Sequence, residues 1–132
     1  MDTDVILDFL LDREPFSEAS TILFSMGDQG KIKLYSSGLV FSNCYYILRK
    51  ISTHQKVIEK LTLLASFMDF TLINKQVILD ALQSSFRDFE DALQNASAST
   101  SGLNILLTRN TKDYRQSELS VLTPDGYLAS LV

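Results

Sequence analysis

Acidic side chains gather at three places in the sequence, in a way that suits metal chemistry. The chain opens MDTDVILD, in which Asp2, Asp4 and Asp8 are interspersed with the first residues of an apolar run. SFRDFEDALQNA holds a second group of acids, and TRNTKDY places Asn110 and Asp113 after an apolar segment. Carboxylates gathered at a helix start or beyond a strand can face a metal ion such as Mg²⁺, which prefers oxygen ligands. These segments are the candidate site.

Each group also has an ordinary structural explanation. Asn and Asp favour turns for local hydrogen-bonding reasons, which could account for Asn110 and Asp113. Asp88 is placed to cap a helix, with Glu90 and Asp91 in its first turn, where the helix dipole favours negative charge. Capping does not exclude a second role facing a metal, so both interpretations stay open.

Elements that could position these residues alternate along the chain. The predicted strands are residues 31–35 (KIKLY), 70–73 (FTLI) and 104–108 (NILLT), with a last short strand before a helix that begins at Pro124. Helical periods run over residues 16–26, 39–50 and 57–67. This alternation predicts a three-layer α/β arrangement around a parallel sheet. Ligands bind such sheets beyond the carboxyl ends of the strands, where Asn110 and Asp113 are expected.

Length and composition narrow the class of protein. A chain of 132 residues, 45% hydrophobic, fits one domain spanning residues 1–132. The net charge of −4 argues against tight non-specific binding to nucleic acid. A single cysteine excludes an intrachain disulfide, and with a single histidine there is no basis for a zinc site. With no membrane-length apolar run and no signal peptide, we expect a soluble, cytoplasmic protein.

Three further residues call for an interpretation. Asn43 lies on an apolar helix face beside Leu39 and Ile47, so its amide needs a polar neighbour across the sheet. Cys44 and His54 have no evident third partner for nucleophilic catalysis. We interpret them as a core-facing thiol and a histidine at a helix start.

Four segments together resemble the PIN domain. They are DTDVILDFLLDREPF, SSGLVFSNCYYILRK, DFEDALQNASA and ILLTRNTKDYRQSELSVLTPDGYL, in the order and spacing of that family. The chain is similar over essentially its whole length to small prokaryotic PIN proteins such as the VapC-type toxins. The resemblance implies a three-layer α/β/α sandwich with a central, mostly parallel sheet of four to five strands. It also implies a ribonuclease using Mg²⁺ or Mn²⁺, with RNA as substrate, an antitoxin protein as partner and a homodimer.

The same resemblance assigns the site residue by residue. Asp2, at the end of the first strand, Asp91 and Asp113 match the metal-binding acids. Thr108 matches the polar residue that orients the phosphate or a carboxylate, and Asn110 stands at a position that is Asp or Asn in the family. Asp4 and Asp8 are then expected to cap a helix or face solvent. The basic residues around Asp113 could hold RNA phosphates or be solvated loop charges; they are Arg109, Lys112 and Arg115.

Two departures from the family pattern bear on activity. Asn43 stands where the family usually has a glutamate, although Glu90 could supply negative charge instead, and the apolar residues that normally precede the first acid are absent. We therefore expect weaker metal affinity and a preference for Mn²⁺. The alternative is a catalytically weakened PIN-like module retained for protein association. A receiver-type signalling domain fits less well, because FTLINK supplies no phosphoacceptor Asp.

Overall fold

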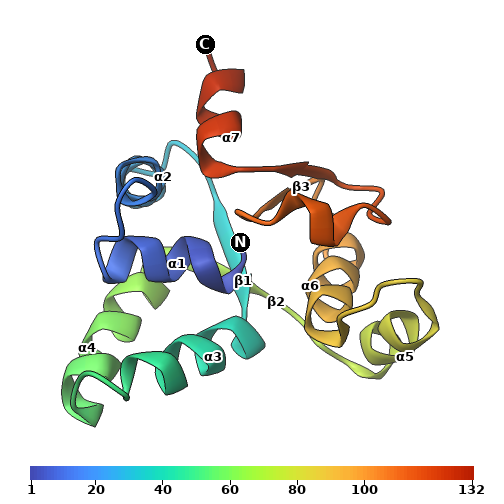
Figure 1. The fold of residues 1–132 in the computed structure, drawn as a ribbon, viewed down its shortest axis with the longest axis horizontal. Coiled ribbons are helices and arrows are strands. Elements are labelled where there is room, and N and C mark those ends of the chain that lie inside the picture. Colours follow the sequence, from blue (N-terminus) through green and yellow to red (C-terminus); the bar gives the residue numbers. More distant parts are fainter.

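The computed structural model describes residues 1–132 as a mixed α/β protein (Figure 1). The seven α-helices are α1 (Thr3–Leu10), α2 (Ser17–Asp28), α3 (Gly38–Leu48), α4 (His54–Ala65), α5 (Lys75–Gln83), α6 (Phe89–Thr100) and α7 (Pro124–Ser130). The strands are β1 (Leu34–Ser37), β2 (Met68–Thr71), β3 (Ile105–Leu107) and β4 (Ser120–Leu122), and a 3-10 helix spans Thr111–Tyr114. The α/β class is confirmed. The predicted helices lie within two or three residues of the observed ones.

The four strands do not form one central sheet, which corrects the expectation of four to five strands side by side. β1 pairs with β2 in parallel, from Leu34 opposite Met68 to Ser37 opposite Thr71. β3 pairs with β4 in parallel, from Ile105 opposite Ser120 to Leu107 opposite Leu122. The parallel pairing agrees with the sequence pattern, but β1 and β3 are not paired with each other. Strands β1 and β2 overlap the predicted segments, but their ends are shifted by two or three residues.

The buried apolar residues divide in the same way. One cluster packs α1–α4 against β1 and β2; its members are Ile6, Leu7, Phe24, Leu34, Val40, Cys44, Leu48, Val57, Leu61, Leu64 and Met68. A smaller cluster lies between α5 and α6 and contains Val77, Ala81, Ala92 and Leu93. In Figure 1, α1 to α4 lie on one side of β1, and α5 and α6 lie on the other. The hydrophobic core therefore consists of two separate clusters, as the strands consist of two separate pairs.

Local sequence explains why the helices begin where they do. Six helices carry a side-chain cap that accepts a hydrogen bond from the first turn: Asp2, Ser37, Thr53, Asn74, Asp88 and Thr123. Pro124 occupies the first turn of α7, where its missing N–H costs nothing. The cap at Asp88 confirms the helix start predicted from SFRDFEDALQNA. None of the helices has the length and apolar character needed to cross a membrane.

Two predictions about single side chains are also settled by the fold. Cys44 is fully buried in the larger cluster, and burial raises the pKa of its thiol to about 12. His54 is the first residue of α4, and its Nδ1 lies 2.9 Å from the hydroxyl of Tyr45. Both residues have the structural roles expected of them.

Candidate active site

An acidic hollow lies where the starts of α1 and α6 meet α3 and the segment after β3. It has a volume of about 440 Å³. Its lining residues are Asp2, Thr3, Asp4, Asn43, Tyr46, Ile47, Asp88, Glu90, Asp91, Asn110 and Asp113. Six of these are carboxylates, two are amides, and none is Lys or Arg. The hollow therefore joins all three acidic segments of the sequence.

Asp2 is held by neutral donors at the edge of this hollow. Its Oδ1 accepts a 2.8 Å hydrogen bond from the backbone N–H of Thr3, which makes it the cap of α1. Its Oδ2 accepts hydrogen bonds from the hydroxyl of Thr108 at 3.0 Å and from that of Tyr114 at 3.3 Å. The expected first strand ending at Asp2 is not present: Asp2 is the cap of α1, and the helix begins at Thr3.

Asp91 lies opposite Asp2, in the first turn of α6. The hydroxyl of Tyr114 lies 3.2 Å from its Oδ1. One hydroxyl has one proton, so Tyr114 donates to Asp91 or to Asp2 at any moment and links the two acids. Burial, and then the neighbouring charges of Asp88 and Asp2, raise the pKa of Asp91 to about 6. Burial and the charges of Asp2 and Asp91 raise the pKa of Tyr114, which keeps its proton available for donation.

The two amides of the hollow each contact a carboxylate. Asn43 donates from Nδ2 to Oε2 of Glu90 at 3.2 Å, which supplies the polar neighbour that its place on α3 demands. Asn110 donates from Nδ2 to Oδ2 of Asp4 at 3.3 Å. Asp113, in the 3-10 helix, lines the hollow and its charge adds to the raised pKa of Asp91. The amide donors of Asn43 and Asn110 thus orient Glu90 and Asp4 without themselves carrying a positive charge.

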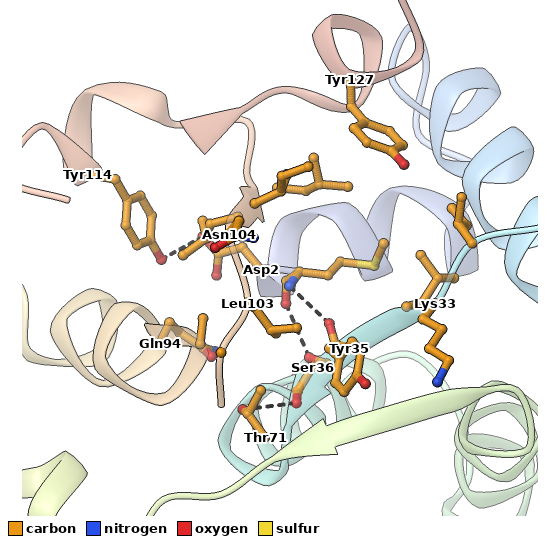
Figure 2. Close-up of a pocket in the computed structure, with 18 residues that line it drawn as sticks. Asp2, Lys33, Tyr35, Ser36, Thr71, Gln94, Leu103, Asn104, Tyr114 and Tyr127 are labelled. Carbon is orange, nitrogen blue, oxygen red and sulfur yellow. Dashed lines mark hydrogen bonds between the residues drawn. The ribbon is translucent and has the colours of Figure 1, made fainter. Parts of the chain in front are cut away.

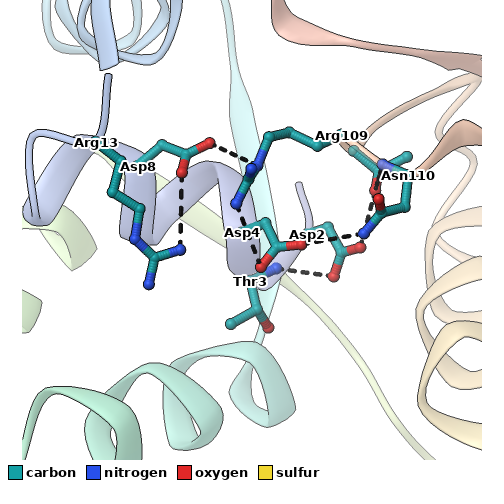
Figure 3. A network of polar contacts seen from close by, with 8 residues as sticks. Asp2, Thr3, Asp4, Asp8, Arg13, Arg109 and Asn110 are labelled. Atoms are coloured by element: carbon teal, nitrogen blue, oxygen red, sulfur yellow. Dashed lines mark hydrogen bonds and ion pairs between the residues drawn. The ribbon is translucent and has the colours of Figure 1, made fainter. Parts of the chain in front are cut away.

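Asp8 is not part of the hollow, and the expectation that it caps a helix or faces solvent is wrong. Its side chain is fully buried and pairs with Arg109, whose Nε lies 3.0 Å from its Oδ2 (Figure 3). Arg13 lies 3.8 Å away on the other side. The Asp8 contact to Arg109 is an ion pair without hydrogen-bond alignment. Burial raises the pKa of Asp8, and the charges of Arg109 and Arg13 oppose that shift.

This pairing determines what the basic residues after β3 can do. Figure 3 shows the guanidinium of Arg109 between Asp8 and Asp4, and its Nη2 lies 4.0 Å from Asp4. The guanidinium also lies 4.1 Å from the ring centroid of Phe16. Arg109 is therefore engaged within the protein. Lys112 and Arg115, by contrast, are exposed, and in the sequence they flank Asp113, which lines the hollow.

The hollow suits a divalent metal ion in the type and charge of its side chains. Its lining offers oxygen ligands and an excess of negative charge, both of which favour a cation. A bound cation would also stabilise the charged form of Asp91 and so lower its raised pKa. However, no three acidic, histidine or cysteine side chains converge closely enough to hold an ion. The side chains are of the type that binds a divalent metal ion, but they do not all converge on one point.

Comparison with known families now identifies the class. A family model described as the PIN domain matches residues 1–112. The chain belongs to the PIN domain family, whose members are generally nucleases that typically use divalent metal ions. No curated protein matches the chain.

Sequence reasoning found most of the hollow but missed Tyr114. The hydroxyl of this residue touches both central acids, although the ring itself is almost fully buried. The D-Y pair in TRNTKDY was the available signal, since a buried tyrosine hydroxyl usually has a polar partner. Asp88 was expected to cap a helix, with a second role left open, and it both caps α6 and lines the hollow.

Proposed function

We propose that the protein is a metal-dependent endoribonuclease and the toxin component of a toxin–antitoxin pair, similar to the VapC-type proteins. The observation that carries this proposal is the gathering of six carboxylates around one hollow with no basic residue in its lining. Such a concentration of negative charge is unfavourable without a cation: after burial, the charges of Asp88 and Asp2 contribute to the raised pKa of Asp91. Membership of a family of nucleases supports the assignment.

Asp2, Asp91 and Asp113 are the proposed metal ligands, with Mg²⁺ or Mn²⁺ as the ion. When bound, such an ion supplies an activated water and neutralises charge that develops on the phosphate during hydrolysis. Asn43 and Asn110 would remain neutral members of the site. The contact between Asn43 and Glu90 supports a role for Glu90 as the acid that compensates for the missing glutamate.

The surrounding residues have positioning roles in this proposal. Thr108 donates to Asp2 and accepts from the backbone N–H of Asn110 at 3.1 Å, so it links the cap of α1 to the segment after β3. Tyr114 links Asp2 to Asp91. Lys112 and Arg115 are the proposed contacts to RNA phosphates, because they are exposed and have no acidic partner within 4 Å in the structure.

The VapC-like assignment also implies two kinds of association. One is an antitoxin segment that covers the hollow, and the other is a homodimer. A segment that inhibits such a site would have to present positive charge to the six carboxylates. That requirement gives the partner a recognisable chemistry, namely a basic peptide.

The competing proposal is a PIN-like module that serves protein association and has lost catalysis. Asn43 in place of a carboxylate and the incomplete convergence of the acids favour it. Metal binding separates the two proposals, because an association module has no need of a metal ion.

The test is cleavage of a mixed single-stranded RNA by the purified protein in Mn²⁺, in Mg²⁺ and in EDTA. Asp91→Asn removes a central acid, and Asp28→Asn at the exposed end of α2 is the matched control. We expect cleavage that needs metal, is lost in Asp91→Asn and persists in Asp28→Asn. Equal cleavage by both variants would indicate a contaminant. Absence of cleavage together with absence of Mn²⁺ binding by calorimetry would favour the association module.

A further inference from the structure

The acidic hollow has one apolar edge, and an exposed aromatic ring lies on it. Nine of its eleven lining residues are polar or charged, and the other two are Tyr46 and Ile47 of α3. Ile47 is half-buried and packs against the larger hydrophobic cluster. Tyr46 is 66% exposed, and it is the only one of the five tyrosines in the chain that is exposed. The fold therefore leaves a large aromatic side chain open to a ligand at the edge of the hollow.

Tyr46 lies within one helical turn of the acids. Asn43 precedes it by three residues on α3, so the two side chains are neighbours on one face of the helix. The amide of Asn43 donates to Glu90 at 3.2 Å. Figure 1 shows α3 leading away from α6 toward the start of α4. A group held at the carboxylates would therefore have its next neighbour, in the direction of α4, beside the ring of Tyr46.

Neighbouring side chains support the ring of Tyr46 without covering it. The ring of Tyr45 meets it in a T-shaped contact, with centroids 5.4 Å apart and planes at 79°. Tyr45 is itself fixed by packing against the larger cluster and by the contact of its hydroxyl with His54. A T-shaped contact occupies at most one face of either ring. At least one face of Tyr46 is therefore free for stacking.

The charge of the hollow favours a nucleobase as the occupant of that face. RNA is a polyanion, whereas the hollow carries six carboxylates without a Lys or Arg, and the chain has a net charge of −4. Stacking of a base on an aromatic ring provides affinity that does not depend on charge. A basic peptide, by contrast, would be attracted by the carboxylates alone. The substrate that most needs a neutral aromatic contact beside these acids is therefore RNA.

A cation follows the ring along the chain. Lys50 comes four residues after Tyr46, just beyond the end of α3, and is exposed. It has no acidic partner within 4 Å in the structure. Acids, aromatic ring and cation thus follow one another along α3. This order suits a reacting phosphate, then a base, then a further phosphate of one strand.

We propose that Tyr46 is the stacking platform for one unpaired nucleobase next to the phosphate that is cleaved, and that Lys50 contacts a phosphate beyond it. This inference rests on the proposed ribonuclease function and specifies its substrate as RNA that is single-stranded at that nucleotide. A base can lie on the ring only when it is splayed out of its own helix. Because every base has a π-face, the contact supplies affinity and tolerates all four bases.

The first experiment measures steady-state cleavage in Mn²⁺ of a short single-stranded RNA whose cleavage site has been mapped. It compares wild type, Tyr46→Ala, Tyr46→Phe and Leu63→Ala. Leu63 is the matched control, since it is 64% exposed on α4 and does not line the hollow. We expect kcat/KM to fall about tenfold or more in Tyr46→Ala, mainly through KM, and to change little in the other two variants. Tm should be unchanged in all of them.

The second experiment identifies the base. The nucleotide on each side of the cleavage site is replaced in turn by an abasic ribose. At one of the two positions the replacement should slow wild type about tenfold and slow Tyr46→Ala hardly further, because the same contact is then already lost. An abasic effect of equal size in the two proteins would overturn the proposal, because the base would then have another partner.

Two further outcomes are decisive. Binding of an oligo-arginine peptide that weakens in Tyr46→Ala, with RNA cleavage unaffected, would assign the ring to a protein partner and overturn the proposal. If wild type cleaves RNA in a metal-dependent way and Tyr46→Ala cleaves it equally well, this inference fails and the proposed function stands. If wild type cleaves no RNA with any metal ion, the proposed function fails and this inference fails with it.

Discussion

Replacing Asp91 with Asn should make the metal-free protein more stable at pH 7.5. Burial and the charges of Asp88 and Asp2 raise the pKa of Asp91 from 3.8 to about 6. The folded protein therefore binds this proton more tightly than the unfolded chain does. Consequently the free energy of unfolding falls as the pH rises from about 4 to above 6, and the full penalty is present at pH 7.5. Comparing the wild-type protein with Asp91→Asn measures this penalty directly.

The size of the effect follows from the shift. About two pKa units correspond to about 3 kcal/mol if no screening applies. Asp91 is only partly buried, so solvent screening reduces this to about 1–1.5 kcal/mol. For a chain of this length that is a rise in Tm of about 3–5 °C. Asn retains an oxygen that can accept the hydrogen bond from Tyr114, so the contact need not be lost.

The assay is urea unfolding in EDTA at pH 7.5 and pH 4.5 for wild type, Asp91→Asn and the Asp28→Asn control. The gain in Asp91→Asn should be largest at pH 7.5 and fall to about a third at pH 4.5. Adding Mn²⁺ at pH 7.5 should stabilise wild type and not Asp91→Asn. A variant less stable than wild type at pH 7.5, or a gain independent of pH, would refute the electrostatic reasoning.

Three other substitutions test the neighbouring contacts. Tyr114→Phe removes the hydroxyl that touches both central acids; it should cost about 1–2 kcal/mol in urea unfolding and weaken Mn²⁺ binding several-fold by calorimetry. Arg109→Met leaves the carboxylate of Asp8 buried and should cost about 3 kcal/mol by thermal unfolding, whereas adding Asp8→Leu should recover most of that loss. Asn43→Glu opposes Glu90; it should lower metal-free stability by about 1 kcal/mol and tighten Mn²⁺ binding about tenfold, and unchanged affinity would place Asn43 outside the site.

Local features of the fold could be predicted from the sequence because they depend on local chemistry. Asp88 and Pro124 mark helix starts through capping and a fixed backbone angle, and both helices begin there. The segment NILLT was recognised because a short apolar run bounded by a turn signal at Gly102 is typical of a buried strand. The carboxyl end of that strand then located Asn110 and Asp113 near the hollow.

The arrangement of strands could not be predicted in the same way, because it depends on which edges pair across the molecule. Alternating helices and strands indicated a single sheet, yet β1 and β3 are not paired with each other, and residues of both line one cavity (Figure 2). Nothing in the composition of either strand distinguishes a paired edge from an open one. The sequence pattern predicted the class and the parallel direction but not the continuity of the sheet.

Asp8 and Asp2 have different partners in the structure, which the spacing of acids in the sequence does not reveal. The two acids are six residues apart on the same short segment, and the pattern alone could not separate them. Asp8 meets the guanidinium groups of Arg109 and Arg13, so its charge is neutralised where it is buried. Asp2 meets only neutral donors, Thr108 and Tyr114 among them, which orient its oxygens and leave its charge in place.

This difference provides a physical criterion for the site. An acid paired with an arginine, as Asp8 is with Arg109, gains little from a metal ion, because its charge is already compensated. An acid held by hydroxyl and amide donors keeps both its geometry and its charge, and Asp2 and Glu90 are each held in this way by at least one such donor. Asp91 is held likewise by Tyr114, and burial followed by the neighbouring charges of Asp88 and Asp2 raises its pKa. A cation that entered the hollow would therefore find side chains already oriented and still negatively charged, which is why we assign function to the hollow and a structural role to Asp8.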